Sequence, residues 1–275
     1  MKLGLDSYSY HLAFGAHPDF EHRNPMDLFQ FMDRVAGLGL DGFQIDPMHM
    51  ESRDKGYLSE LTAHAGENNL FMEYGAMGID AAYLKRELDV CAALGSRVLR
   101  TFIDFNRYDQ STKVEDEIEL AIDQLKRVRG YAEALDISIA IENHGDVSAT
   151  ELVEIIQRVN SPHVGICLDL GNALLTFENP LEAATKMAPY ACSTHFKDYA
   201  IQMTNYGFKV SGVALGDGNI DLESAMKIIR EKSSLDRIIL EIPVEAGGST
   251  VDALVKEDHY IRKSIVYARN VLGIR

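Results

Sequence analysis

Short runs of apolar residues recur along the chain, and the longer stretches between them carry apolar residues at helical spacing. Residues 137–144, ISIAIENH, form the clearest of these runs. Because the run leaves no polar positions for a solvent-facing side, it predicts a parallel strand buried on both faces. The run closes on Glu142, and a buried carboxylate needs a hydrogen bond, an opposite charge or a metal ion.

The same alternation predicts eight strands and eight helices. The strands are expected at 2–10, 40–46, 69–75, 96–103, 137–144, 164–172, 192–198 and 237–245. The helices are expected at 25–38, 57–68, 80–94, 113–135, 148–159, 180–188, 221–232 and 252–271. Strand–helix repeats of about 30 residues indicate an α/β fold, a (β/α)8 TIM barrel, and we expect residues 1–275 to form it as one domain.

One segment interrupts this alternation. Residues 199–218 follow the seventh strand, are rich in glycine and polar residues, and are predicted to form a long loop. A loop of this length inside a compact domain is usually a lid or a binding loop. An open doubly wound sheet is the main alternative fold, but it would require a glycine-rich phosphate turn after an early strand, and the sequence contains no such motif.

Composition and charge narrow the classes of protein. The chain is 46% hydrophobic and 25% charged, which suits a globular protein with a large core. Its formal net charge of -15 opposes binding to nucleic acid, whose phosphates attract lysine and arginine. No apolar run reaches the ~18 residues of a membrane span, and no leader pattern opens the chain. We therefore expect a cytoplasmic protein whose three cysteines, Cys91, Cys167 and Cys192, are reduced. Cys167 and Cys192 lie in apolar strand-like runs and are expected to be buried thiols.

Four of the predicted strands close on a side chain that can bind a metal. Glu142 closes the fifth strand, and Asp169, His195 and Glu241 close the next three. Because the active site of a TIM barrel lies at the carboxyl ends of its strands, we expect these four side chains to converge. Three carboxylates and one imidazole suit a single divalent ion, Mn²⁺ above all, with Mg²⁺, Co²⁺ and Zn²⁺ as alternatives.

The motifs around these residues resemble a known family. ENH at 142–144, LDLGN at 168–172, HFKD at 195–198, GDGNID at 216–221 and LEIP at 240–243 are similar to the xylose-isomerase-like TIM-barrel superfamily, in its sugar phosphate isomerase/epimerase branch. The resemblance implies that Glu142, Asp169, His195 and Glu241 hold one metal ion. It also implies that Glu142 and Glu241 act as the acid and base on the two faces of the reacting carbon, as in the epimerases of this branch.

Two positions differ from the ketose 3-epimerases of the superfamily. Those enzymes carry a substrate-binding histidine after the ligand aspartate and an arginine after the ligand histidine, where this chain has Asn172 and Lys197. We expect Asn172 to contact the substrate. Lys197 is expected to hold a carboxylate or phosphate, with a salt bridge to Asp198 or to a barrel carboxylate as the alternative. The ENH motif also resembles superfamily lyases that act on 3-oxo sugars, where the histidine is a base, and this nominates His144 as catalytic.

Other side chains at the strand ends are weaker candidates. Arg100 closes the fourth strand and is expected to bind an anion, either the substrate or a carboxylate such as Glu73. His144 faces the same side as Glu142 by strand alternation, where a structural hydrogen bond is the alternative to a role as base. Tyr8, Tyr10 and His11 follow the first strand and are candidates for the wall of the sugar site, with His11 as a substrate contact. Aromatic residues at such positions are more often part of the core. Residues expected around the metal ligands are Gln44, Asp46 and Glu73.

Three functions remain open from the sequence. The first is a divalent-metal-dependent isomerase or epimerase of a keto-sugar or sugar acid, acting through a metal-stabilised enediolate. The second is a lyase on a 3-oxo sugar or sugar acid, whether decarboxylase, dehydratase or C-glycoside deglycosidase. The third is a sugar-binding barrel without catalysis. In each case the expected partner is a small sugar or sugar acid, with no nucleic acid and no membrane, and a homo-oligomer is left open.

Overall fold

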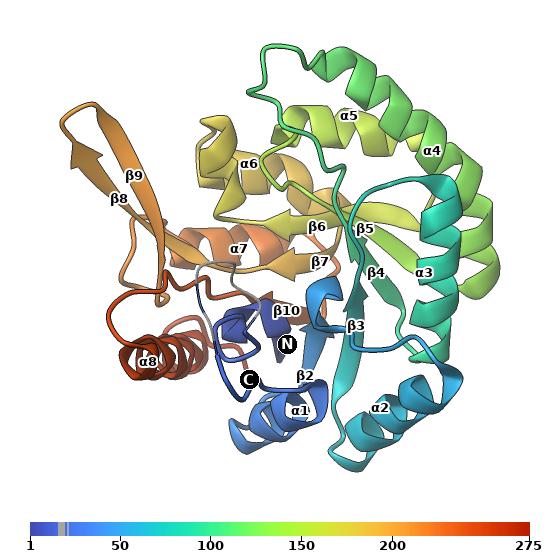
Figure 1. Cartoon of the computed structure of the whole chain (residues 1–275). Helices are drawn as coiled ribbons and strands as arrows, with labels where there is room; N and C mark the ends of the chain where they lie inside the picture. Colours follow the sequence, from blue (N-terminus) through green and yellow to red (C-terminus); the bar gives the residue numbers. More distant parts are fainter. Residues whose placement is uncertain (16–19, 21) are drawn as a thin grey trace.

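Parallel strands form the wall of a barrel in the computed structural model, which describes residues 1–15, 20 and 22–275 (Figure 1). The strands are β1 (Lys2–Asp6), β2 (Gly42–Ile45), β3 (Phe71–Gly75), β4 (Val98–Thr101), β5 (Ser138–Glu142), β6 (Val164–Asp169), β7 (Ala191–His195) and β10 (Arg237–Leu240). They form an 8-stranded sheet in the order β10-β1-β2-β3-β4-β5-β6-β7. A parallel bridge between Phe196 and Leu240 brings β7 back to β10, so the barrel is nearly closed and the predicted TIM-barrel fold is confirmed.

A helix follows each barrel strand along the chain and covers the outside of the sheet (Figure 1). The helices are α1 (Leu28–Gly37), α2 (Lys55–Glu67), α3 (Ala81–Ala93), α4 (Val114–Leu135), α5 (Ala149–Val159), α6 (Pro180–Met187), α7 (Leu222–Lys232) and α8 (Thr250–Asn270). Ser148 begins α5 in a capping box, because its side chain and that of Glu151 each accept the other's backbone N–H. The apolar helix faces pack against the strands in one large core.

Two boundaries near the start of the chain differ from the prediction. The first strand is shorter than expected, because the Asp6 side chain accepts the backbone N–H of Tyr8 at 2.6 Å and turns the chain into a short 3-10 helix. The first helix begins three residues later than expected, because Asp27 caps it through the backbone N–H of Gln30. Both corrections come from a local side-chain cap.

The last barrel strand is also shorter than the predicted range of 237–245. β10 ends at Leu240, since the Ile242 N–H is bonded to Ser9 Oγ at 3.0 Å and Pro243 has no N–H to donate. Neither residue can therefore continue the parallel ladder. The Glu241 side chain is left at the rim of the barrel, immediately beyond the last paired residue.

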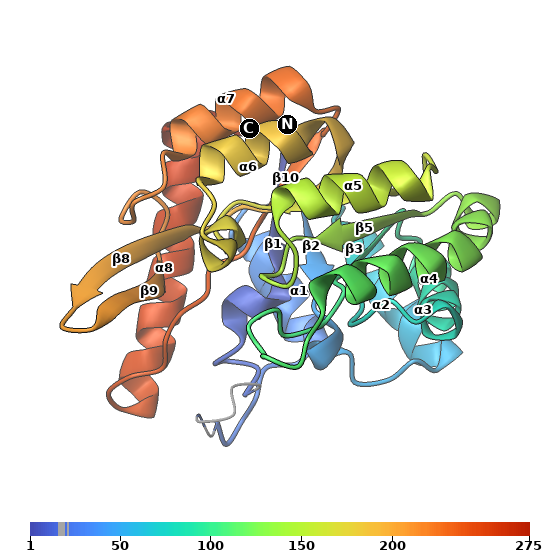
Figure 2. The same cartoon turned by 90° about the horizontal axis from the view of Figure 1, so that it is seen from above.

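The segment predicted as a long loop is instead a β-hairpin. Its strands are β8 (Asp198–Thr204) and β9 (Gly207–Val213), which pair antiparallel and project away from the barrel (Figure 2). Met203 faces Phe208 across the hairpin, and both are exposed, whereas Lys209 on the opposite face binds Glu245 at 2.8 Å. The loop prediction was wrong because glycine and polar residues at alternate positions hid a two-residue period.

The barrel interior is polar towards the carboxyl ends of its strands. Gln44 on β2, Glu73 on β3, Arg100 on β4 and Ser193 on β7 are all at most 3% exposed. Because buried polar groups need partners, these side chains bond to one another and to the strand-end carboxylates. This polar interior is where the candidate site begins.

The cysteines and the helices bear on two further expectations. The three cysteines are free, with Cys91 and Cys167 buried and Cys192 half-buried. The Cys91 thiol lies 3.4 Å from the Val98 carbonyl oxygen, so it packs within the core. Among the helices of the described residues, none combines the length and the hydropathy that crossing a membrane would require.

Candidate active site

The four predicted metal ligands come together at the carboxyl end of the barrel. Glu142, Asp169 and His195 are the last residues of β5, β6 and β7, and Glu241 directly follows β10. One ligand atom from each lies within 4.8 Å of the others, and all four residues are buried. Parallel strands end at a common rim, which explains why residues up to 99 positions apart in the sequence meet here.

His195 directs one ring nitrogen at the three carboxylates. Its Nδ1 lies 3.1 Å from Glu142 Oε1, 3.1 Å from Glu241 Oε2 and 3.9 Å from Asp169 Oδ2. Burial by itself would lower the pKa of His195, but the neighbouring carboxylates outweigh it and raise that pKa well above its usual value. A ring nitrogen in this position must carry either a proton or a metal ion.

The donor set fits a divalent ion. Asp169 Oδ2 and Glu241 Oε2 are buried oxygens that share the single ammonium group of Lys197, and burial raises the pKa of Asp169 to about 8 against the charge of Lys197. A cation shared by these oxygens would relieve both the lost solvation and the repulsion between carboxylates. Cys167 also lies near Glu142 and His195, but burial holds the pKa of its thiol well above the usual value, so the carboxylates are the better ligands.

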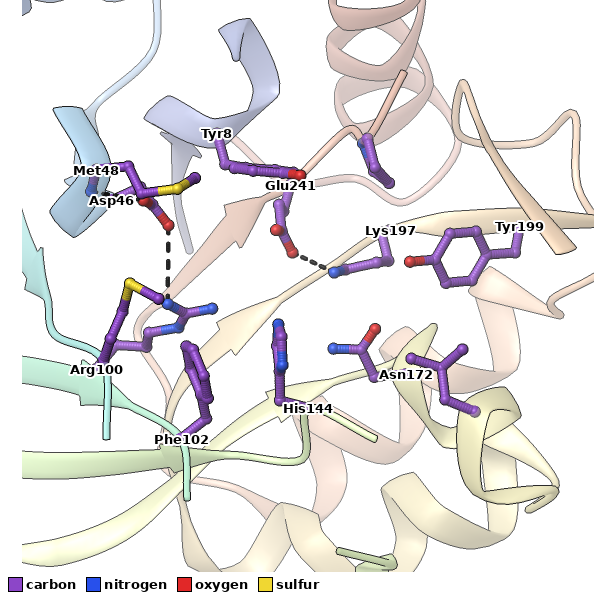
Figure 3. A pocket seen from close by; sticks show the side chains of 13 residues that line it. Tyr8, Asp46, Met48, Arg100, Phe102, His144, Asn172, Lys197, Tyr199 and Glu241 are labelled. Carbon is purple, nitrogen blue, oxygen red and sulfur yellow. Dashed lines mark hydrogen bonds and ion pairs between the residues drawn. The ribbon is translucent and has the colours of Figure 1, made fainter. Parts of the chain in front are cut away.

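Lys197 is ion-paired with two of the four ligands. Its Nζ lies 2.7 Å from Asp169 Oδ2. It also pairs with Glu241 Oε2 (Figure 3). The lysine stem passes Gly171, where a Cβ would come within 2.7 Å of Lys197 Cγ. The structure therefore contains the salt bridge to barrel carboxylates that was the alternative for Lys197. Lys197 is buried and also lines the cavity, so it is placed where a substrate could reach it. Its contact with substrate stays a prediction.

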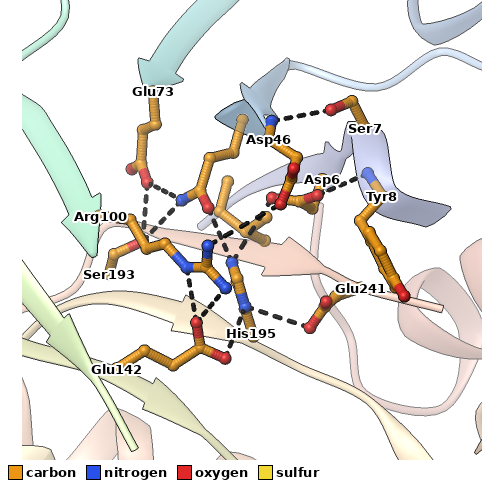
Figure 4. A network of polar contacts seen from close by, with 12 residues as sticks. Asp6, Ser7, Tyr8, Asp46, Glu73, Arg100, Glu142, Ser193, His195 and Glu241 are labelled. Carbon is orange, nitrogen blue, oxygen red and sulfur yellow. Dashed lines mark hydrogen bonds and ion pairs between the residues drawn. The ribbon is translucent and has the colours of Figure 1, made fainter. Parts of the chain in front are cut away.

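Arg100 is bound to the ligand Glu142 (Figure 4). Its Nε donates to Glu142 Oε2 at 2.5 Å, and NH1 lies 3.8 Å from Asp46 Oδ2. Burial alone would raise the pKa of Glu142, but Arg100 and His195 outweigh it and hold that pKa well below its usual range. The carboxylate partner of Arg100 is therefore Glu142, and not the suggested Glu73.

Two asparagines orient the ligands. Asn172 donates its side-chain amide to Glu142 Oε1 at 3.1 Å and its backbone N–H to Asp169 Oδ1 at 2.8 Å. Asn143 bonds both backbone groups of Asp169, at 2.8 and 2.9 Å, and so ties the ends of β5 and β6 together. Asn172 also lines the cavity, where its predicted contact with substrate is sterically open. Sequence analysis gave Asn143 no role.

A cavity of about 320 Å³ opens above the ligands (Figure 3). It is lined by Tyr8, Asp46, Met48, Met77, Arg100, Phe102, His144, Asn172, Leu175, Lys197, Tyr199, Glu241 and Pro243. The His144 ring stacks on Phe102 at 4.2 Å and points into the cavity, and it has no hydrogen bond to any described residue. Burial lowers the pKa of His144, with Arg100 and Lys197 acting in the same direction and Glu142 against it.

His11 lies elsewhere than expected. It is absent from the cavity lining, and its ring stacks on Tyr8 at 4.7 Å, with Nδ1 2.9 Å from the Tyr8 carbonyl oxygen. The chain after β1 forms a 3-10 helix over Ser7–Tyr10, which places Tyr8 beside the cavity and His11 behind it. Of these two residues, Tyr8 therefore lines the cavity and His11 does not.

Further cavity residues carried little signal in the sequence. Asp46 was expected only near the ligands, but it lines the cavity, and burial together with Asp6 raises its pKa to about 7 against the effect of Arg100. Phe102 and Tyr199 were not singled out at all. Their positions in the sequence could have identified them, because Phe102 and Tyr199 each lie within a few residues of the carboxyl end of a barrel strand.

Comparison with known proteins identifies the family. The family model described as xylose isomerase-like TIM barrel matches residues 32–269. This chain belongs to that family. The predicted resemblance is thereby confirmed, and it extends over the strands that carry all four candidate ligands.

Relatives in the xylose isomerase-like family differ in their reactions. The 3-oxo-isoapionate decarboxylase of Pectobacterium atrosepticum is 28% identical over 275 residues, covering 98% of this chain and 96% of that protein. A crystal structure of D-psicose 3-epimerase in the presence of D-fructose has a TM-score of 0.77 at 18% identity, covering 99% of this chain and 100% of the other. The crystal structure of the IOLI protein with a bound zinc atom has a TM-score of 0.77 at 16% identity, covering 99% of this chain and 98% of the other. The two structures share the fold with this chain, and the relatives include both epimerases and a decarboxylase.

Proposed function

We propose that this protein is a metal-dependent lyase that decarboxylates a 3-oxo sugar acid. The observation that carries the proposal is the unequal state of the candidate acid–base groups in the cavity. Glu142 has both oxygens engaged, by Arg100 at Oε2 and by Asn172 at Oε1, whereas the His144 ring faces the cavity without a hydrogen-bond partner among the described residues. His144 and Glu142 thus differ in their freedom to transfer a proton and do not form a symmetric pair.

The two glutamates are poorly suited to the epimerase mechanism. Epimerisation needs a base on one face of a carbon and an acid on the other, each with a pKa near the working pH. Burial would raise the pKa of Glu241, but Lys197 and His195 outweigh it and lower that pKa, and Arg100 does the same to Glu142. Carboxylates held so firmly in the ionised form are weak proton acceptors from carbon and good metal ligands.

The cavity suits a small anionic substrate. Its volume of about 320 Å³ is at the small end of the range for ligand pockets, which fits a single sugar unit. Arg100 and Lys197 are both buried cations on its wall. Each already neutralises a ligand carboxylate, and each retains N–H groups that can face a substrate carboxylate.

Atoms and charge balance in the proposed reaction. The bond from the carboxylate carbon to its neighbour breaks, and the electron pair moves towards the 3-oxo group as CO₂ leaves. One proton then returns to that neighbouring carbon, so one 3-oxo carboxylate and one proton give one ketone and one CO₂. We assign delivery of this proton to His144, whose ring faces the cavity.

Glu142, Asp169, His195 and Glu241 would hold the divalent ion. When bound, such an ion polarises a ketone and stabilises negative charge on its oxygen. We propose Mn²⁺ because three carboxylates and one imidazole form a mixed oxygen and nitrogen donor set. The curated relative is a decarboxylase by name and aligns over nearly the whole chain, which supports the lyase proposal over the isomerase or epimerase that was placed first from sequence.

The deciding experiment follows the carbon and the hydrogen of the substrate. Protein supplied with Mn²⁺ is incubated in D₂O with a 3-oxo sugar acid, and headspace CO₂ and product mass are measured. We expect equal amounts of CO₂ and ketone, with one deuterium on the carbon that lost the carboxylate. Deuterium in a product of otherwise unchanged mass, without CO₂, would establish the isomerase or epimerase instead. Binding without either reaction would indicate a sugar-binding barrel.

A second prediction concerns Lys197 and the substrate anion. Replacing Lys197 by methionine removes the charge and keeps the stem, so it should weaken binding of an unreactive aldonate by about 10–100-fold, the value of one charge-assisted hydrogen bond. The matching alditol, which has no carboxylate, should bind equally to both proteins in calorimetry. Lys209→Met on the exposed hairpin is the control. Equal losses for aldonate and alditol would restrict Lys197 to its contacts with Asp169 and Glu241.

A further inference from the structure

His195 has two hydrogen-bonding sides, and the side away from the ligands contains only acceptors. Its Nε2 lies 2.7 Å from Gln44 Oε1 and 3.5 Å from Asp6 Oδ2. Two acceptors on one side require Nε2 to carry the ring hydrogen. Nδ1, which lies 3.1 Å from oxygens of both Glu142 and Glu241, is then the nitrogen left to hold a metal ion together with them.

The orientation of the Gln44 amide is itself imposed by its neighbours. Gln44 Nε2 donates to Glu73 Oε2 at 2.9 Å and lies 3.5 Å from Ser193 Oγ. The Ser193 hydroxyl donates to the same Glu73 oxygen at 2.7 Å (Figure 4). A flipped amide would set the Gln44 oxygen against the Glu73 carboxylate. It would also set the NH₂ group against the protonated Nε2 of His195.

These contacts follow from the register of the sheet. Asp6, Gln44 and Glu73 are paired neighbours on β1, β2 and β3, and they therefore lie at one level inside the barrel. All three are at most 1% exposed, as are Ser193 and His195. No bulk water competes for the hydrogen bonds at this level, so each partner is determined by the neighbouring side chain.

We propose that Gln44, held by Glu73 and Ser193, is a positioning residue that keeps Nε2 of His195 protonated and Nδ1 available to the metal. This inference rests on the proposed metal centre and extends it from the four ligands to the side chains behind one of them. A hydrogen bond at the distal nitrogen fixes the tautomer and plane of a ligand imidazole and makes it a stronger donor. Loss of such a partner typically costs about 10–100-fold in metal affinity.

Two substitutions at the same position test the role. Gln44→Leu removes the acceptor at nearly constant volume, and we expect Mn²⁺ affinity in calorimetry to fall about 10–100-fold. Gln44→Glu keeps an acceptor for the Nε2 hydrogen, and we expect it to lose less than about tenfold. Gln202→Leu, the same substitution at an exposed residue of the hairpin, is the matched control and should bind Mn²⁺ as the unmodified protein does.

A spectroscopic readout separates positioning from general damage to the fold. In the Zn²⁺-loaded protein, nitrogen-15 NMR of His195 should show a protonated Nε2 with slow solvent exchange and a metal-bound Nδ1. Gln44→Leu should lose the protected Nε2 hydrogen, and Gln44→Glu should retain it. Zinc bound through Nε2 in the unmodified protein would overturn the proposal, whatever the variants do.

The remaining outcomes distinguish this inference from the proposed function. If the unmodified protein binds no divalent ion, the metal centre itself is wrong. If it binds one and Gln44→Leu binds it equally well, with the Nε2 hydrogen still protected, only the role of Gln44 fails. In that case Asp6, at 3.5 Å, is the acceptor that holds the ring.

Discussion

Replacing His144 by alanine is expected to lower kcat for decarboxylation by about 10²–10⁴-fold, the range that one positioned acid or base contributes. The ring faces the cavity and makes no hydrogen bond to any described residue, so no other part of the structure depends on it except its stacking on Phe102. Metal content should be unchanged, because His144 is outside the cluster of four ligands. The measurements are CO₂ release at saturating substrate and elemental analysis of the same samples.

The control for this experiment is a histidine of the same chain that lies far from the site. His259 on the exposed surface of α8 serves, and His259→Ala should leave kcat and metal content as they are. Near-full activity of His144→Ala, combined with inactive Glu142 or Glu241 variants, would favour the paired-glutamate epimerase mechanism. Loss of metal from His144→Ala would move the imidazole into the ligand set.

Replacing Glu241 by glutamine is expected to weaken metal binding by more than about 100-fold, beyond the loss typical of residues behind the ligands. The change keeps the shape of the side chain but removes the charge that faces His195 and Lys197. Activity should fall with metal occupancy. Elemental analysis of the purified protein and a calorimetric titration with Mn²⁺ measure the effect.

Thermal unfolding gives an independent check of this second prediction. Metal at 100 times its dissociation constant should stabilise the unmodified protein by about 2.7 kcal/mol, and this gain should disappear in Glu241→Gln. Glu245→Gln, the same substitution at an exposed residue four positions away, should keep it. A Glu241→Gln protein that binds and is stabilised as before would show that the four side chains are not a metal centre.

The comparison of prediction and structure is most informative at the strand ends. Glu142, Asp169 and His195 could be placed at one rim from sequence, because an apolar run marks a buried strand and its last residue marks the carboxyl edge. This reasoning needs only the order of elements and the parallel geometry of the barrel. It requires no knowledge of which side chains touch.

Boundaries and local turns were less accessible. The shortened first strand and the hairpin in place of a loop depend on single caps and on a weak alternation that glycine and polar residues obscure. Such features differ by small free energies, about 1 kcal/mol for one cap, and the sequence pattern does not rank them. Tyr8 and His11 were both expected near the site, and the turn after β1 places only Tyr8 of these two in the cavity wall.

The sequence by itself determined the barrel, its family resemblance and the four residues that meet at its rim. The tertiary structure alone decided which side chain contacts each ligand. Arg100 donates a hydrogen bond to Glu142, Lys197 forms an ion pair with Asp169, and Gln44 is hydrogen-bonded to His195. The physical reason is that alternation assigns a side chain to a face of its strand, whereas a partner depends on distances across the barrel. Gln44 and His195 are separated by 151 positions in the chain and by 2.7 Å in space, and only the closed sheet brings them together.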